Sequence, residues 1–150
     1  MRREPGLSNA CVDASVGVKW VLPEQHSQTA LRLYADCRQL NTTIAAPPHF
    51  PVEVTNAIRR RVARRLVTHE EARVLLATFS QFSVRLAIPG SLYQEALDLA
   101  DTFNRPTVYD THYVALAKIL GCDLWTADET LLNVLGNNAP WVRFIGDYRP

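Results

Sequence analysis

Short apolar runs alternate with longer amphipathic segments along most of this chain. Runs of strand length occur at residues 10–14, 42–46, 84–88, 122–126 and 142–145. Apolar residues at spacings of three and four, which are typical of helices, occur at residues 15–22, 24–37, 51–66, 68–82, 91–103, 107–120 and 131–135. Strands that alternate with helices predict an α/β fold, a three-layer α/β/α sandwich around a mostly parallel five-stranded sheet.

The helix at 107–120 and the strand after it place two acids at one edge of that sheet. Gly121 ends the helix, as glycine often does, and residues 122–126 form a short strand. Asp110 lies in the first helical turn, in line with the apolar Tyr113 and Ala117, and Asp128 follows the strand. A helix that leads back into a parallel strand runs antiparallel to it. Asp110 and Asp128 should therefore meet at the carboxyl edge of the sheet.

Two further acids are predicted at the same edge. Asp13 ends the first strand, and Glu53 lies in the first turn of the helix that follows the second strand. Ligand crevices in such sheets lie outside the carboxyl ends of the strands. Each acid alone is explained by helix capping or by the helix dipole. Four acids at one edge favour a functional site.

Four clustered carboxylates repel one another, which raises their pKa values unless a positive charge is present. Mg²⁺ or Mn²⁺ relieves this repulsion, since both ions prefer oxygen ligands and bind through a few carboxylates plus substrate phosphate. The chemistry that this arrangement suggests is metal-assisted hydrolysis of a phosphodiester. Asp13, Glu53, Asp110 and Asp128 are the predicted catalytic and metal-binding residues.

Composition narrows the class of protein. The 150 residues predict one domain over residues 10–150, after a flexible leader at 1–9. A formal charge of +1 gives no overall case for nucleic-acid or membrane binding, so any such case depends on local patches. No apolar run approaches a membrane span. Three cysteines without a CxxC motif predict reduced core residues in a cytoplasmic protein.

Three segments resemble the PIN-domain family, and within it the VapC-type toxins of bacterial toxin–antitoxin pairs. They are VDASVGVKW (12–20), PVEVTNAIRR (51–60) and VYDTHYVALAKILGCDLWTAD (108–128). The resemblance implies a Mg²⁺- or Mn²⁺-dependent ribonuclease in which Asp13, Glu53, Asp110 and Asp128 form the acidic constellation. It also implies supporting roles for the hydroxyl residues Ser15 and Thr126.

The resemblance also implies protein partners besides the RNA substrate. A small antitoxin would cover the acidic edge with its C-terminal tail, which would carry an arginine. Homodimers are usual in the family, and apolar residues around Leu75, Leu76 and Phe79 on the two middle helices are candidates for protein contacts.

Five arginines follow Glu53 on the same predicted helix, at 59, 60, 61, 64 and 65. Three interpretations stay open for them: a solvated face, a contact with an acidic partner, or a track for the RNA backbone that includes Arg59, Arg60 and Arg64. Trp20, Trp125, Trp141, Tyr109 and Tyr113 are assigned to the core rather than to base stacking. Lys19 is predicted to be solvated, and His112 to face away from Asp110.

Two other function classes compete with the ribonuclease. A phosphatase or phosphoacceptor domain using Asp13 is disfavoured, because such phosphatases usually show a DxD pair and this chain has Asp13-Ala14-Ser15. A non-catalytic binding module that uses metal only for stability is the other alternative.

Overall fold

The computed structural model describes residues 8–150, so residues 1–7 of the predicted leader lie outside the described part, and Asn9 already belongs to the first strand. The strands are β1 (Asn9–Val12), β2 (Thr43–Ala46), β3 (Arg85–Leu86), β4 (Leu124–Thr126) and β5 (Val142–Phe144). The α-helices are α1 (Ala14–Gly17), α2 (Ser27–Gln39), α3 (Phe50–Ala63), α4 (His69–Phe79), α5 (Leu92–Thr102), α6 (Tyr109–Leu120) and α7 (Glu129–Leu135). Short 3₁₀ turns are η1 (Val18–Trp20), η2 (Gly136–Asn138) and η3 (Ile145–Asp147).

The five strands form one sheet in the order β3-β2-β1-β4-β5, and every pair of neighbours is parallel. The predicted α/β class is therefore confirmed. β1 is the central strand, with Ala10 opposite Ile44 on one side and Val12 opposite Trp125 on the other. Strand order reverses between β1 and β4, and such a switch point is where ligands bind in open α/β sheets.

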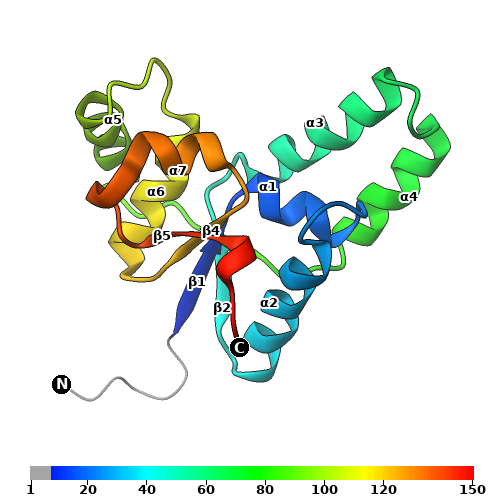
Figure 1. Cartoon of the computed structure of the whole chain (residues 1–150), viewed down its shortest axis with the longest axis horizontal. Coiled ribbons are helices and arrows are strands. Elements are labelled where there is room, and N and C mark those ends of the chain that lie inside the picture. Colours follow the sequence, from blue (N-terminus) through cyan, green and yellow to red (C-terminus); the bar gives the residue numbers. More distant parts are fainter. Residues whose placement is uncertain (1–7) are drawn as a thin grey trace.

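Helices cover both faces of this sheet (Figure 1). The chain moves from β1 through β2 to β3 and then returns to β4 and β5. Because crossovers between parallel strands are right-handed, this reversal places α1 to α4 on one face and α5 to α7 on the other. Each helix within residues 8–150 is too short or too polar to cross a lipid bilayer.

Helix ends follow local chemistry at some positions and not at others. Thr68 caps α4, and its Oγ1 accepts a hydrogen bond from the N–H of Glu71 at 3.1 Å. Ser91 precedes α5 in a sequence that resembles a capping box, but its φ and ψ of −92° and 0° are not extended and its side chain makes no capping bond. The predicted strand at 84–88 shrinks to Arg85 and Leu86, two exposed residues at the sheet edge.

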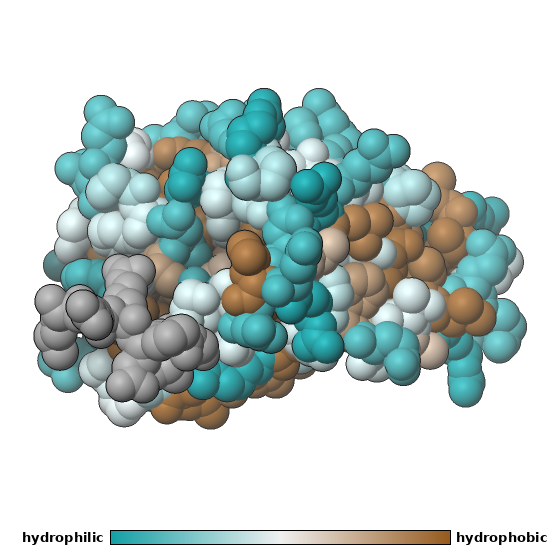
Figure 2. Space-filling view, turned by 90° about the horizontal axis from the view of Figure 1, so that it is seen from below, coloured by the Kyte–Doolittle hydropathy of each residue, from teal (hydrophilic) through white to brown (hydrophobic). Residues whose placement is uncertain are grey.

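The α3–α4 pair projects from the body of the molecule as an arm (Figure 1). Apolar surface gathers on this side in the view of Figure 2. The arm's Leu66, Val74 and Leu76 are exposed. Of the other residues suggested for protein contacts, Leu75 is half-buried and Phe79 belongs to the core, where it stacks on Trp20. Homodimer formation through this arm stays a prediction.

Candidate active site

Two of the predicted carboxylates cap the helices that follow neighbouring strands. Asp13 comes directly after β1, and its side chain accepts a hydrogen bond from the N–H of Val16 at 3.2 Å. Asp128 follows β4, and its Oδ1 accepts from the N–H of Leu131 at 3.1 Å. Because β1 and β4 are adjacent and parallel, both caps lie at the switch point. Helix capping fixes one oxygen of each carboxylate without removing the group from the site.

Glu53 and Asp110 reach the same place from the first turns of α3 and α6. All four carboxylates line one cavity of about 260 Å³. Its wall also includes Ser15, Asn56, Arg60 and Tyr113. Residues up to 115 positions apart in the chain, Asp13 and Asp128, thus share a single polar cavity. Sequence direction alone predicted this convergence, and the roles of the residues stay a prediction.

Asp13 is held by two hydroxyl groups that the resemblance had singled out. Ser15 and Thr126 each donate a hydrogen bond to its carboxylate, one to each oxygen. The same hydroxyls accept from the backbone: Ser15 Oγ from the N–H of Ala127 at 2.8 Å, and Thr126 Oγ1 from the N–H of Asp128 at 3.0 Å. Ser15 and Thr126 therefore join the loop after β4 to the loop after β1 and orient Asp13.

Electrostatics in the cavity oppose full ionisation. Burial raises the pKa of Asp13 to about 6, against the hydrogen bonds from Ser15 and Thr126 that lower it, and the charge of Asp128 raises it further. Burial also raises the pKa of Asp110, as do the charges of Asp128 and Glu53. Arg105 opposes the shift, since its Nη2 lies 3.6 Å from Asp110 Oδ2. The carboxylates repel one another as expected for a site that binds a cation.

Glu53 is oriented by two residues that sequence reasoning did not assign to the site. The hydroxyl of Tyr113 donates to Glu53 Oε1 at 2.7 Å, and His49 Nε2 lies 3.2 Å from the same oxygen. Tyr113 is buried as predicted, and burial followed by the hydrogen bond to Glu53 raises its pKa. Spacing in the sequence could have indicated both residues. Tyr113 lies three positions after Asp110 on one helix, and His49 lies four positions before Glu53.

Basic residues near the cavity separate into distinct groups. Arg60 lines the cavity, whereas Arg59 and Arg64 do not. Arg61 pairs with Glu24. The prediction for Lys19 is wrong: it is 9% exposed because its Nζ lies 3.3 Å from Glu24 Oε1, which compensates its charge. His112 does not line the cavity, and its Nδ1 contacts the carbonyl of Val108.

The donor set suits a hard divalent cation. Four carboxylates on one wall supply the oxygen ligands that Mg²⁺ and Mn²⁺ prefer, and the raised pKa values of Asp13 and Asp110 show charge that a cation would neutralise. No three histidine, cysteine or carboxylate side chains within residues 8–150 lie close enough together to form a complete metal site as they stand. Mg²⁺ keeps several waters and needs only one or two carboxylates, so the residues fit it.

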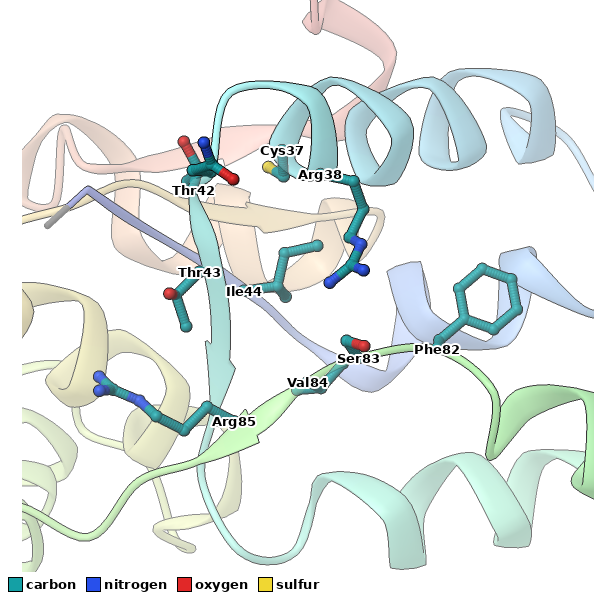
Figure 3. A pocket seen from close by; sticks show the side chains of 10 residues that line it. Cys37, Arg38, Thr42, Thr43, Ile44, Phe82, Ser83, Val84 and Arg85 are labelled. Atoms are coloured by element: carbon teal, nitrogen blue, oxygen red, sulfur yellow. The ribbon is translucent and has the colours of Figure 1, made fainter. Parts of the chain in front are cut away.

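A second cavity, of about 590 Å³, lies at the opposite end of β2 (Figure 3). In Figure 3 the side chain of Arg38 extends from α2 toward Ser83. None of the predicted site residues lines this cavity, and it contains no carboxylate. Its lining is Cys37, Arg38, Asn41, Thr42, Thr43, Ile44, Phe82, Ser83, Val84 and Arg85. This second cavity therefore lacks the carboxylates of the first.

Comparisons with known proteins agree with this fold. The model of the PIN domain family matches residues 10–136. Ribonuclease VapC12 of Mycobacterium tuberculosis is 37% identical over 128 residues, 85% of this chain and 93% of the relative. Ribonuclease VapC3 of Pyrobaculum aerophilum is 32% identical over 123 residues, 80% and 89% of the two chains. The crystal structure of PAE2754 from Pyrobaculum aerophilum superposes with a TM-score of 0.65 at 23% sequence identity, and the match covers 93% of this chain and 92% of that one.

Proposed function

This chain belongs to the PIN domain family, in its VapC type, and on that premise we propose that it is a Mg²⁺- or Mn²⁺-dependent endoribonuclease. It hydrolyses phosphodiester bonds of RNA and acts as the toxin of a toxin–antitoxin pair. The single observation that carries the proposal is the cavity lined by Asp13, Glu53, Asp110 and Asp128. The names of the two relatives, both ribonucleases, support the same substrate class.

Asp13, Asp110 and Asp128 would hold the cation, with Glu53 beside them. A divalent cation bound there neutralises charge on the scissile phosphate and lowers the pKa of a water. An acidic cavity repels a polyanion by itself, so the positive charge of a cation held there would also favour binding of the substrate. This chain's own residues supply the remaining requirements, which are orientation and local positive charge.

Orientation comes from the hydroxyl groups around the carboxylates. Ser15 and Thr126 fix both oxygens of Asp13, so that its ligand direction is set before substrate binds. Tyr113 and His49 engage Oε1 of Glu53, and within residues 8–150 its Oε2 has no hydrogen-bond partner. That oxygen would orient the attacking water and receive its proton.

Partners follow from the family assignment. We expect a small antitoxin whose C-terminal tail covers the acidic cavity, an arginine of the tail pairing with the carboxylates. We also expect a homodimer, and a cytoplasmic protein whose three thiols stay reduced. The thiols of Cys11 and Cys122 lie 3.7 Å apart and are not bonded to each other.

Cleavage of RNA by the purified chain, freed of any bound partner, tests the proposal. The reaction is run with Mg²⁺, with Mn²⁺ and with a chelator. Asp110→Asn removes one charge and keeps the shape, so we expect cleavage to fall by at least roughly 100-fold, the scale of losing one key electrostatic group. Asp98→Asn is the matched control, because Asp98 is an exposed acid on α5. An active Asp110→Asn chain, or cleavage that persists in chelator, would refute the proposal.

A further inference from the structure

The arginines of α3 do not all lie on the same side of the helix. An α-helix turns by roughly 100° per residue, so Arg60 and Arg64 lie within roughly 20° of the direction of Glu53, on either side of it. Arg59 lies roughly 120° away by the same count. Arg60 lines the acidic cavity together with Glu53 and Asn56, and Arg64 is the C-cap residue one turn further on.

The positive charges of Arg60 and Arg64 are not neutralised by acidic side chains in the described part of the protein. Within residues 8–150, ion pairs engage Arg32, Arg61, Arg105 and Arg143. Neither Arg60 nor Arg64 has an acidic partner or a side-chain hydrogen bond there, and both are exposed. Arg61 differs, since it holds the arm against Glu24. Two exposed guanidinium groups are thus available to a ligand that enters the acidic cavity.

Their spacing suits an extended polyanion. With a rise of about 1.5 Å per residue, Arg60 lies about 10 Å along the axis from Glu53 and Arg64 about 6 Å beyond Arg60. The distance of about 6 Å between Arg60 and Arg64 along the helix axis is comparable to the separation of neighbouring phosphates in an extended nucleic-acid strand. Guanidinium groups bind phosphate oxygens through paired N–H donors. Arg60 and Arg64 thus form a short basic stripe that runs outward along the arm from the cavity wall.

We propose that Arg60 and Arg64 bind successive phosphates of single-stranded RNA on the side of the cleaved bond that runs outward along α3. The inference rests on the proposed function, and it names the direction in which the substrate strand leaves the acidic cavity. It also explains how an acidic cavity attracts RNA: Arg60 places a positive charge on the cavity wall itself. An acidic protein partner is the competing ligand for the same arginines, and the experiment separates the two.

The test measures binding without cleavage. Fluorescein-labelled single-stranded RNA of mixed sequence is titrated with the Asp110→Asn chain at constant Mg²⁺ and several NaCl concentrations. Arg60→Gln and Arg64→Gln are each added to this background. We expect each to weaken binding several-fold and to reduce the slope of log K against log salt by about 0.7, the value for one single-strand phosphate contact.

Arg73→Gln is the matched control, because Arg73 is an exposed arginine on α4, the other helix of the arm, and does not line the acidic cavity. It should leave both affinity and slope unchanged, and Arg59→Gln should change the slope less than Arg60→Gln does. Equal losses from Arg59→Gln, Arg60→Gln and Arg73→Gln would show an effect of net charge alone and would overturn the inference. Unchanged RNA binding in Arg60→Gln and Arg64→Gln would also overturn it and would favour the acidic partner.

Failure of this inference is distinct from failure of the proposed function. If the unmodified chain cleaves RNA with metal but the arginine variants bind RNA normally, only the strand path is wrong. In a cleavage assay with the unmodified active site, the variants should raise KM and leave kcat within about two-fold, since uniform binding is lost rather than transition-state contacts. A chain that cleaves no RNA refutes the proposed function itself.

Discussion

At the scale of single residues, the environment of Asp13 differs from that of an ordinary surface acid. Its carboxyl is 7% exposed, and burial raises its pKa from 3.8 to about 6. The folded chain therefore binds this proton more tightly than the unfolded chain. The stability that Asp13 contributes is present below about pH 4 and is lost as the pH rises through about 6. In the metal-free chain, the ionised carboxylate of Asp13 therefore lowers the stability of the fold.

Asp13→Asn should consequently stabilise the metal-free protein near neutral pH. A shift of about two pKa units corresponds to roughly 3 kcal/mol at about 1.4 kcal/mol per unit. Urea unfolding in chelator measures the difference, which should be largest above about pH 7 and should vanish toward about pH 4. Asp98→Asn, at an exposed position, should show no such trend. A variant less stable than the parent at neutral pH would contradict the prediction.

Tyr113 shows a role that the sequence concealed. Its place in the core was predictable from helical spacing, but the hydrogen bond to Glu53 joins residues 60 positions apart. Only the fold brings the first turns of α3 and α6, from opposite faces of the sheet, to the same edge. Lys19 was mispredicted for the same reason, because its partner Glu24 becomes a neighbour only after the chain turns at η1. The four acids were predictable since strand direction alone determines the edge at which they lie.

Tyr113→Phe removes the hydroxyl and keeps the ring. We expect the fold to persist and kcat to fall roughly 10-fold, because a hydrogen bond to a charged group is worth about 1.5–3 kcal/mol and part of it orients Glu53. Steady-state kinetics on RNA, with thermal unfolding alongside, measure both effects. Tyr93→Phe serves as the control, since Tyr93 is an exposed tyrosine of α5. A drop in melting temperature without any change in kcat would leave Tyr113 a packing residue only.

At the scale of helices and strands, strong local signals predicted the fold and weak ones failed. Gly121 ends α6 in the left-handed region at φ 65°, as its sequence position predicted. The amphipathic spacing of the residues in α3, α5 and α6 was also sufficient to predict these three helices. β3 was overestimated because alternation in five residues resembles a strand, whereas pairing at a sheet edge supports only two. Ser91 matched a capping box in sequence, but the backbone around it is not extended.

Helices α1 and α3 pack closely against each other at Gly17. A Cβ added at Gly17 would lie 2.6 Å from Cζ of Phe50 and 3.3 Å from Cγ2 of Val54. Phe50 is 1% exposed, so its ring has no free space to enter. The contact matters for the site because α1 begins after Asp13 and α3 carries Glu53. The glycine allows the two carboxylates to approach one cavity.

Gly17→Ala should therefore destabilise the fold by about 1–3 kcal/mol, the usual cost of overpacking a core, and should also lower the cleavage rate. Urea unfolding gives the first quantity and the RNA assay the second. Gly90→Ala is the matched control, because a Cβ there meets nothing within 4 Å. Equal stability of Gly17→Ala and the parent would mean that α1 and α3 can shift apart freely, contrary to the prediction.

At the scale of the whole molecule, near-neutral net charge conceals an uneven distribution. The formal charge is +1 over 150 residues, yet four carboxylates share one cavity. Arg60 and Arg64, which have no acidic partner within residues 8–150, lie on the helix that leads away from it. Net charge could not predict this, since it depends on which strands are neighbours. The order β3-β2-β1-β4-β5 places the acids at the switch point, where repulsion among them opposes folding until a cation binds.

A cation that binds only the folded chain should therefore raise its melting temperature. At a Mn²⁺ concentration about 100 times Kd the gain is about 2.7 kcal/mol, or roughly 5–10 °C for a chain of this size. Protons compete for Asp13 below its pKa of about 6, so the increase should be smaller at about pH 5 than at about pH 7.5. Asp110→Asn should reduce the increase and Asp98→Asn should not. An increase that grows as the pH falls, or one that Asp110→Asn leaves unchanged, would place the cation outside the acidic cavity.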